Sequence, residues 1–313
     1  MELANPIHLT GSVPIIPIPF DAQEEIDEEG LRRLVEFAVE KRFSAICLPA
    51  YGSEFYKLTE DERIRVVKIA AHQAAGRVPI LAQSNHGSSR VALELARTHI
   101  KNGANMISIA LPRQFALSDD DLLRYLEPIL NGVNVPSLVQ DFSPAGGTIG
   151  AEFTARLLEK CANFSYLKME EPMLAPKLAA ILDRTGGRVG VLEGTGGLYL
   201  LELIPYGLCG IMPCLGVADA LDVVFKLRAA NKNDEAFDLY GKLLPRILFS
   251  FQSFQHFEVY LYCEKRLLQA RGLISTANCR NAGFTPDPHT VHYVDELNER
   301  TLETLKNLGS GTA

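Results

Sequence analysis

The stretch VPILAQSNHGSSRVALELARTHIKNGANMISIAL, residues 78–111, holds two short apolar runs on either side of a helical pattern. The runs at 78–84 and 105–111 are almost continuously apolar, which is typical of strands buried on both faces of a sheet. Between them, residues 88–102 repeat apolar side chains at i, i+3, i+4 and i+7, the spacing of an amphipathic helix. Parallel strands need a crossover of this length, so the stretch predicts a strand–helix–strand unit of a parallel sheet.

The same alternation recurs through the chain. Helical patterns separate further apolar runs at 13–18, 44–50, 135–141, 164–168, 188–194 and 208–213, which makes eight runs in all. Eight strand–helix units predict an α/β fold of the (β/α)8 TIM barrel type, which needs roughly 200 to 250 residues. We therefore place the barrel, with the active site, at residues 1–230 and a C-terminal three-helix extension at residues 231–313.

An open doubly wound sheet is the alternative fold. Such sheets bind dinucleotides through a G-x-G-x-x-G turn. The nearest match begins with Gly194 and Gly196 and has Tyr199 in place of the third glycine. The barrel is therefore the preferred prediction.

Composition and charge narrow the range of partners and locations. The chain has 313 residues and a net charge of −7 with no basic block, so nucleic acid is not an expected partner. Its first residues lack the charged and apolar regions of a signal peptide. The charge-free stretch 203–217 is too short and too rich in Gly and Pro to span a bilayer. We expect a cytoplasmic protein with no membrane partner.

Cysteine and histidine spacing gives no sign of a metal centre. The six cysteines form no C-x-x-C pair, so neither a disulfide framework nor a zinc site is expected. His289 and His292 form one short pair without a cysteine partner or an H-E-x-x-H motif. No metal is predicted.

In a TIM barrel the chemistry takes place at the C-terminal ends of the strands. Those ends supply polar and glycine candidates after strands two, three and five and at the ends of strands six and seven. They are Tyr51, Ser53, Glu54, Asn85, His86, Asp141, Lys168, Glu170, Glu193 and Gly194.

Lys168 lies in FSYLKMEEP, residues 164–172, directly before two glutamates. Most lysines beside carboxylates form surface ion pairs. The alternative is a nucleophile, which must lose a proton; burial favours the neutral amine, whereas a close carboxylate opposes it. Strand alternation directs Lys168 and Glu170 to the same side and Glu171 to the other, where it is expected in solvent or paired with a helix.

These features resemble the dihydrodipicolinate synthase and N-acetylneuraminate lyase family of class I, Schiff-base-forming lyases. The motifs that carry the likeness span nearly the whole sequence. They are P-x-P-F at 17–20, S-E at 53–54 with T-x-x-E-R at 59–63, Lys168, E-G at 193–194, G-I-M at 210–212 and KRLLQARGLI at 265–274. The resemblance implies a barrel with three C-terminal helices, an imine between Lys168 and a small-molecule 2-keto acid, no cofactor, and a homotetramer.

Two motifs depart from the family pattern. The strand-two G-T-T-G-E, which binds the keto-acid carboxylate, reads A-Y-G-S-E at 50–54. The strand-five Y-N-x-P-x-R-T-G, which supplies a proton-carrying tyrosine and a carboxylate-binding arginine, reads D-F-S-P-A-G-G-T at 141–148. V-Q-D at 139–141 and Y-L-K-M-E-E-P at 166–172 are instead similar to the 2-keto-3-deoxy-L-arabonate dehydratases. This likeness implies a dehydratase for a 2-keto-3-deoxy sugar acid.

Catalytic roles are suggested for two further residues besides Lys168. The amides of Gly52 and Ser53, with the Ser53 hydroxyl, are expected to hold the substrate carboxylate, although a serine at such a turn is equally a simple cap. Asp141 has no positive partner nearby in sequence and is expected to act as an acid or base if burial raises its pKa. Its alternative is an Asx turn before Pro144.

Substrate-binding roles are suggested for Tyr51, Gly194, Glu170 and His86. Glu170 and His86 suit substrate hydroxyl groups, although His86 is equally a loop histidine without such a contact. Gly146, in place of the family's arginine, argues against a second carboxylate on the substrate.

Three other functions stay open. A pyruvate-dependent class I aldolase would use the same Lys168 imine and enamine but break the C3–C4 bond. A catalytically inactive keto-acid-binding barrel would account for the missing motif residues. A structural oligomer built through the helical tail would leave Lys168 unexplained, although fold likeness alone excludes neither of the last two.

Overall fold

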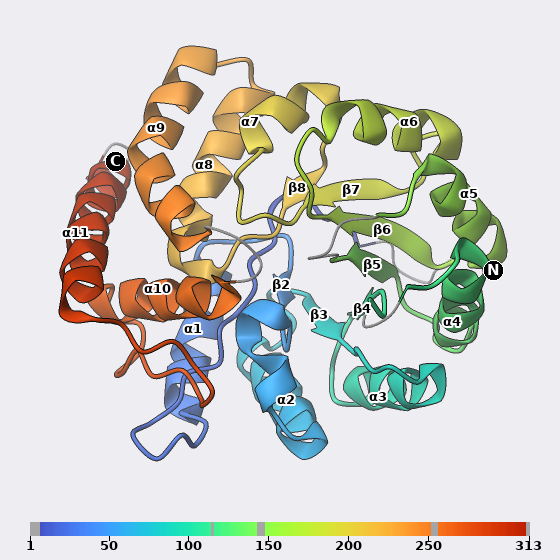
Figure 1. The fold of residues 1–313 in the computed structure, drawn as a ribbon, viewed down its shortest axis with the longest axis horizontal. Helices are drawn as coiled ribbons and strands as arrows, with labels where there is room; N and C mark the ends of the chain where they lie inside the picture. Colours follow the sequence, from blue (N-terminus) through green and yellow to red (C-terminus); the bar gives the residue numbers. More distant parts are fainter. Residues whose placement is uncertain (1–6, 114–115, 143–147, 252–255, 311–313) are drawn as a thin grey trace.

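The strands form a closed parallel barrel. The computed structural model describes residues 7–113, 116–142, 148–251 and 256–310. In these residues eight parallel strands run in the order β1-β8-β7-β6-β5-β4-β3-β2. A parallel bridge between Ile15 and Cys47 joins the segment after β1 to β2 and closes the sheet on itself. Helices surround the strands in Figure 1, so the predicted (β/α)8 TIM barrel is confirmed.

Short strands alternate with helices throughout the barrel. The strands are β1 (Gly11–Ser12), β2 (Ile46–Cys47), β3 (Ile80–Gln83), β4 (Met106–Ala110), β5 (Ser137–Asp141), β6 (Phe164–Met169), β7 (Gly190–Glu193) and β8 (Gly210–Ile211). The helices that follow them in turn are α1 (Glu28–Glu40), α2 (Glu60–Ala74), α3 (Ser89–Lys101), α4 (Asp119–Asn131), α5 (Ala151–Lys160), α6 (Ala175–Thr185), α7 (Leu200–Leu203) and α8 (Ala218–Ala229).

The first strand is shorter than its apolar run predicts. Regular pairing is confined to Gly11–Ser12, whereas the run covers residues 13–18. Pro14 and Pro17 lack the N–H groups that would continue the ladder. The remaining amides still donate to neighbouring strands, from Val13, Ile15 and Ile16. The segment therefore stays in the barrel wall without forming a continuous strand.

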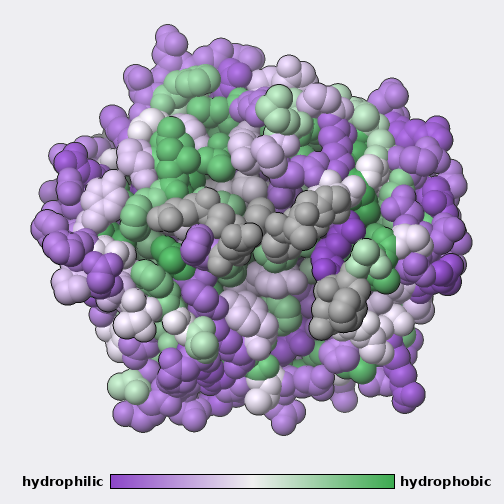
Figure 2. Space-filling view, viewed as in Figure 1, coloured by the Kyte–Doolittle hydropathy of each residue, from purple (hydrophilic) through white to green (hydrophobic). Residues whose placement is uncertain are grey.

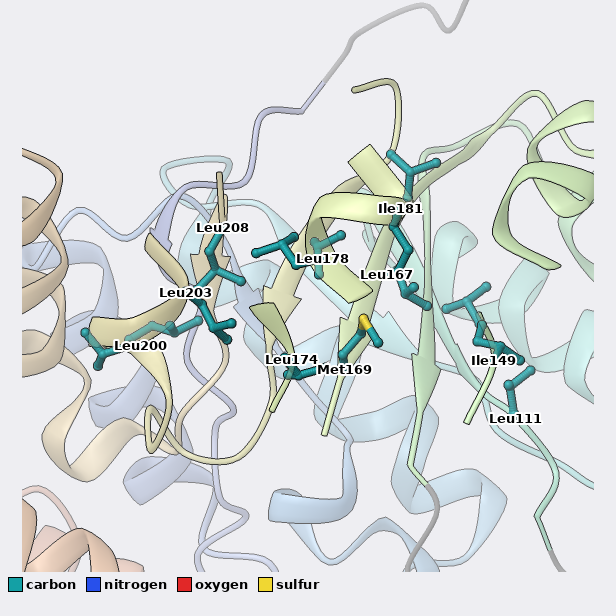
Figure 3. Packing of buried hydrophobic residues seen from close by; sticks show 14 of the residues in the cluster. Leu111, Ile149, Leu167, Met169, Leu174, Leu178, Ile181, Leu200, Leu203 and Leu208 are labelled. Atoms are coloured by element: carbon teal, nitrogen blue, oxygen red, sulfur yellow. The ribbon is translucent and has the colours of Figure 1, made fainter. Parts of the chain in front are cut away.

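Alternate residues of β6 face opposite sides of this wall. Leu167 and Met169 belong to the apolar layer between sheet and helices, where Figure 3 shows them among side chains that include Leu178 of α6. Tyr166 instead belongs to the apolar cluster inside the barrel. Because side chains alternate along a strand, Lys168 points to the interior, as Tyr166 does.

Helices α2 and α4 each begin at a capping box. Thr59 accepts a hydrogen bond from the amide of Glu62, and the Glu62 carboxylate accepts one from the amide of Thr59. Ser118 and Asp121 form the same reciprocal pair at the start of α4. The acidic first turns also interact favourably with the positive end of each helix dipole.

The C-terminal extension consists of α9 (Asn233–Ser250), α10 (Phe257–Ala270) and α11 (Pro288–Ser310) in the described residues. Figure 1 shows the three helices on one side of the barrel. Helix α9 packs against α8 and α11, while α10 lies beside residues 215–217, just after β8. The extension therefore reaches the end of the barrel where the strands finish.

The surface seen in Figure 2 is hydrophilic around its edge, and apolar residues gather in the region of α8 and α9. Phe237 and Leu248 of α9 are among the large apolar side chains that are exposed. None of the described helices has both the length and the hydropathy to cross a bilayer. All six cysteines are free thiols, as their spacing predicts.

A buried charge network joins the extension to the loop after β2. The Glu54 carboxylate is fully buried and is ion-paired with Lys265 of α10 and with Lys57, whose Nζ lies 3.0 Å from Glu54 Oε2. The amide of Arg280 donates to the same carboxylate at 3.1 Å. The Arg280 guanidinium also pairs with Glu62 at the start of α2. Motif residues that are distant in sequence therefore meet around one carboxylate.

Lys265→Met is expected to lower the free energy of unfolding by about 3 kcal/mol, because removing one partner of a buried ion pair leaves the other charge undercompensated. Lys68→Met, at an exposed position of α2, is the matched control and should leave stability unchanged. Urea unfolding followed by circular dichroism measures both. The double variant Glu54→Gln/Lys265→Met should lose less stability than the two single losses added together; strict additivity would contradict this account of the network.

Candidate active site

A small cavity opens at the C-terminal ends of the strands, among residues of six strand ends and of the extension. Its described lining combines one lysine and one glutamate with an amide, two glycines, aromatic rings and aliphatic side chains. The lining residues are Ile15, Tyr51, Gly52, Gln140, Phe142, Lys168, Glu170, Gly194, Met212, Phe251, Phe257 and Tyr260. Five of the residues predicted for the site therefore lie together, namely Tyr51, Gly52, Lys168, Glu170 and Gly194.

Lys168 and Glu170 form the only ion pair among the described lining residues. Lys168 Nζ lies 2.7 Å from Glu170 Oε1, and the two side chains are 5% and 3% exposed. Burial raises the pKa of Glu170, while the Lys168 ammonium and a hydrogen bond from Gln140 lower it. The carboxylate is therefore placed to take a proton from the amine and to return it within a cavity that largely excludes water.

Glu171 points away from this pair, as strand alternation predicts. Its Oε1 lies 2.7 Å from Lys177 Nζ of α6, on the helix side of the barrel wall. The expectation that only Glu170 accompanies Lys168, and that Glu171 pairs with a helix, is confirmed.

Gln140 was not among the candidates, yet it stands beside the pair. It is the register partner of Lys168 across β5 and β6, and its Nε2 donates to Glu170 Oε1 at 2.7 Å. Its Oε1 accepts from Nε2 of Gln83 on β3. The V-Q-D motif held a usable signal. Side chains alternate along a strand, so Gln140 and Asp141 cannot both face the barrel interior.

Asp141 lies on the other face of β5, where it has a positive partner that is not near it in sequence. Nη2 of Arg113 donates to Asp141 Oδ1 at 2.8 Å, and the amide of Ile149 donates to Oδ2 at 2.6 Å. Burial raises the pKa of Asp141, and the Arg113 guanidinium opposes this effect. Asp141 does not line the cavity. Arg113 follows β4, the neighbouring strand, which is why the partner is close in space but not in sequence.

Ser53 also lies outside the cavity lining. Its hydroxyl donates to the carbonyl of Ile16 at 2.6 Å, and its amide donates to the carbonyl of Ala50 at 2.9 Å. Both donors expected to hold a substrate carboxylate therefore already have backbone partners. The structure corrects this part of the prediction: Ser53 anchors the loop after β2 to the segment after β1.

Tyr51 and Gly52 are the residues of that loop that reach the cavity. Burial raises the pKa of Tyr51 to about 12, and the charge of Glu170 adds to the effect, so the phenol keeps its proton at neutral pH. A Cβ at position 52 would lie 2.7 Å from the sulfur of Cys214. Only glycine fits at this close approach without displacing the opposite wall.

His86 is a loop residue outside the cavity. It is exposed, and its Nδ1 accepts from the amide of Ser88 just before α3. The neighbouring Asn85 accepts from the amide of Ala110 at 2.6 Å. The alternative interpretation of His86, a loop histidine without a substrate contact, is the one that the geometry supports.

Gly194 is confined by the two charged residues of the site. A Cβ at this position would lie 2.5 Å from Cε of Lys168 and 2.5 Å from Cγ of Glu170. The preceding Glu193 is buried and accepts from the amides of Thr195 and Gly197, which fixes the loop after β7. Burial raises the pKa of Glu193 to about 7.

Aromatic side chains of the extension complete the cavity lining. Their contribution was not predicted from the sequence. The rings of Phe257 and Tyr260 of α10 are tilted by 33° with centroids 5.5 Å apart, and Phe251 meets Tyr260 edge-on at 5.4 Å. Phe142, after β5, lies 4.6 Å from the ring of Tyr51. The rings of residues 251–260 reach the strand ends only through the packing of the extension on the barrel, and Phe142 meets Tyr51 across the barrel, so no local pattern indicated this wall. The candidate active site thus draws its lining from both the barrel and the extension.

No group of three or more His, Cys, Asp and Glu side chains suited to a metal is found within residues 7–113, 116–142, 148–251 and 256–310. The predictions that concern Pro144 and Gly146 lie outside the described residues.

Comparison with known proteins agrees with this geometry. Residues 8–285 match the dihydrodipicolinate synthetase family. The chain is 24% identical over 275 residues to an L-2-keto-3-deoxyarabonate dehydratase from Azospirillum brasilense, with 87% of each sequence covered. It is 28% identical over 247 residues to a 4-hydroxy-tetrahydrodipicolinate synthase from Acidobacterium capsulatum, covering 78% of this chain and 81% of that protein.

A solved structure gives the same result. The dihydrodipicolinate synthase of Rhodopseudomonas palustris superimposes with a TM-score of 0.87 at 25% identity, covering 96% of this chain and 100% of that one. The match over residues 8–285, together with the barrel and the lysine at the end of β6, shows that the chain belongs to the dihydrodipicolinate synthetase family.

Proposed function

We propose that this protein is a Schiff-base-forming dehydratase that acts on a 2-keto-3-deoxy sugar acid. The observation that carries the proposal is the buried Lys168–Glu170 pair, 2.7 Å apart, in a cavity at the catalytic end of the barrel. A lysine there supplies a nucleophile for the keto group, and the carboxylate beside it supplies the proton transfers.

Imine formation is the first proposed step. Glu170 takes a proton from the Lys168 ammonium, and the free amine attacks C2 of the keto acid. Glu170 returns its proton to the C2 oxygen, a second proton reaches that oxygen from the amine nitrogen, and the oxygen leaves as water. A protonated imine remains on Lys168, and Glu170 is ionised again. Tyr51 and Gly52 line the same cavity, and we assign the substrate carboxylate to the backbone amides of this loop.

Elimination follows from the imine. Glu170 removes a proton from C3, and the electron pair moves to the imine nitrogen, which gives an enamine. The electrons then return to form a C3–C4 double bond while the C4 hydroxyl leaves with a proton from Glu170 as water. Hydrolysis of the resulting imine restores the Lys168 amine. We assign the acid–base role to Glu170 rather than to Asp141, because Asp141 is bound to Arg113 outside the cavity.

The lining favours an uncharged distal group on the substrate. In the described part of the cavity, Lys168 and Glu170 are the only charged side chains, and no arginine is present to hold a second carboxylate. The Azospirillum brasilense relative carries a dehydratase name, which supports a sugar-acid substrate. The synthase names of other relatives keep a pyruvate-dependent aldolase as the second candidate, since it would use the same enamine.

Lys168→Met is expected to abolish turnover, and Glu170→Gln to lower kcat by at least about 100-fold, the usual range for loss of an acid–base group. Lys177→Met is the matched control, because Lys177 pairs with Glu171 on the other side of the wall and should keep near wild-type activity. Steady-state kinetics measures all three. Near wild-type turnover by the Lys168 variant would exclude the imine mechanism.

Incubation with 2-keto-3-deoxy-L-arabonate, followed by NMR, tests the reaction type. We expect 2-oxoglutarate semialdehyde, because loss of the C4 hydroxyl leaves a C3–C4 double bond beside the C5 alcohol. Transfer of a proton from C5 to C3 then gives the C4–C5 enol of this aldehyde. Appearance of pyruvate and glycolaldehyde instead would identify an aldolase.

The imine nitrogen is itself the electron sink, so the proposed reaction needs no metal, nicotinamide or pyridoxal cofactor. Dialysis against EDTA should therefore leave kcat unchanged. Activity that is lost in EDTA and restored by a divalent cation would contradict this part of the proposal.

A further inference from the structure

We propose that Gln140 is a positioning residue that holds the Glu170 carboxylate ionised and directed at the imine, and that Gln83 fixes the orientation of Gln140. The inference rests on the proposed function, in which Glu170 removes the C3 proton. It concerns residues of β3 and β5 that neither form the imine nor transfer the proton.

The three side chains form one hydrogen-bonded chain across the barrel interior. Gln83 Nε2 donates to Gln140 Oε1, and Gln140 Nε2 donates to Glu170 Oε1 at 2.7 Å. The same Glu170 oxygen faces Lys168 Nζ. As whole residues, Gln83, Gln140 and Glu170 are 1%, 2% and 5% exposed, so water offers little alternative bonding. Side chains held in this way have little freedom to turn.

The direction of each bond is fixed by chemistry. A carboxylate only accepts hydrogen bonds, so Gln140 must present its amide nitrogen to Glu170. That leaves the Gln140 oxygen to accept from the second amide. Gln83 supplies this donor and thereby opposes a rotation of the Gln140 amide by half a turn. Gln83 thus acts on Glu170 only through Gln140.

Imine formation makes the hydrogen bond from Gln140 to Glu170 more important. The free ammonium of Lys168 has three N–H donors, whereas a protonated imine has one. Glu170 therefore loses part of its stabilisation from Lys168 just before it must act as a base. The Gln140 donor is unaffected by the reaction and keeps the carboxylate in its basic form.

Deuterium exchange into the methyl group of pyruvate isolates this step. Pyruvate as imine and enamine on Lys168 exchanges its C3 protons with D2O, and ¹H NMR follows the loss of the methyl signal. At saturating pyruvate the pH profile reports groups in the bound complex rather than substrate binding. The proteins to compare are wild type, Gln140→Met, Gln83→Met, the double variant, and Gln23→Met as a control at an exposed position.

Removing the Gln140 donor should raise the pKa of Glu170, since this hydrogen bond is one of the influences that lower it. The basic form then appears only at higher pH. The acid limb of the exchange profile is expected to move up by about one pH unit in Gln140→Met, the size of a single hydrogen bond to a charged group. Gln83→Met should move it less, and the double variant should match Gln140→Met. Gln23→Met should match wild type.

Two results would overturn the inference. An unmoved acid limb in Gln140→Met, with a higher pyruvate concentration needed for half-maximal exchange, would make Gln140 a substrate ligand. Additive shifts in the double variant would show that Gln83 acts independently. If Gln140→Met does not fold, the profile of Gln83→Met decides alone, because Gln83 lies outside the described cavity lining.

Borohydride trapping of pyruvate separates this inference from the proposed function. An adduct on wild-type Lys168 supports the imine, and its presence in each variant shows that the site is intact. Absence of both adduct and exchange in wild type would remove the proposed function itself. Adduct and exchange with an unshifted profile would remove only the role of Gln140.

Discussion

The buried contact between Lys168 and Glu170 sets the main constraint on this structure. Two opposite charges away from water are stable only when their geometry is good and their remaining hydrogen-bonding groups have partners. Gln140 supplies one such partner to Glu170. Gly194 leaves the space that the two side chains need, because a Cβ there would collide with both. The charge of the pair thus accounts for Gln140, and its size accounts for Gly194.

Barrel geometry brings the pair to the catalytic end, and the extension encloses it. The outward residues of β6 pack against the helix layer, which directs Lys168 inward (Figure 3). Phe257 and Tyr260 of α10 form part of the lining of the same cavity. The Glu54–Lys265 contact holds α10 against the loop after β2, so the same helix that is anchored by a buried charge also lines the cavity. Fold stability and site geometry are coupled through this helix.

The sequence was sufficient for the fold and for the central pair. Eight alternating apolar runs predicted the barrel, and strand parity correctly separated Glu170 from Glu171. Parity also explains why Asp141 does not line the cavity. Asp141 seemed the better acid or base by residue type, but the interior position of β5 belongs to Gln140.

Contacts that depend on tertiary structure were not predictable in the same way. The hydroxyl of Ser53 reaches the carbonyl of Ile16, and Arg113 reaches Asp141 from a neighbouring strand. The aromatic wall comes from helices beyond the barrel, which no local pattern connects to the strand ends. In each case the partner was set by strand order and helix packing rather than by spacing along the chain.

A crystal structure of the protein with bound pyruvate would test the central claim most directly. The account predicts a covalent bond between Lys168 Nζ and C2 of pyruvate, a carboxylate on the Tyr51–Gly52 side of the cavity, and a Glu170 oxygen next to C3. Pyruvate bound without a bond to Lys168, or an Asp141 side chain turned from Arg113 to face C3, would contradict it.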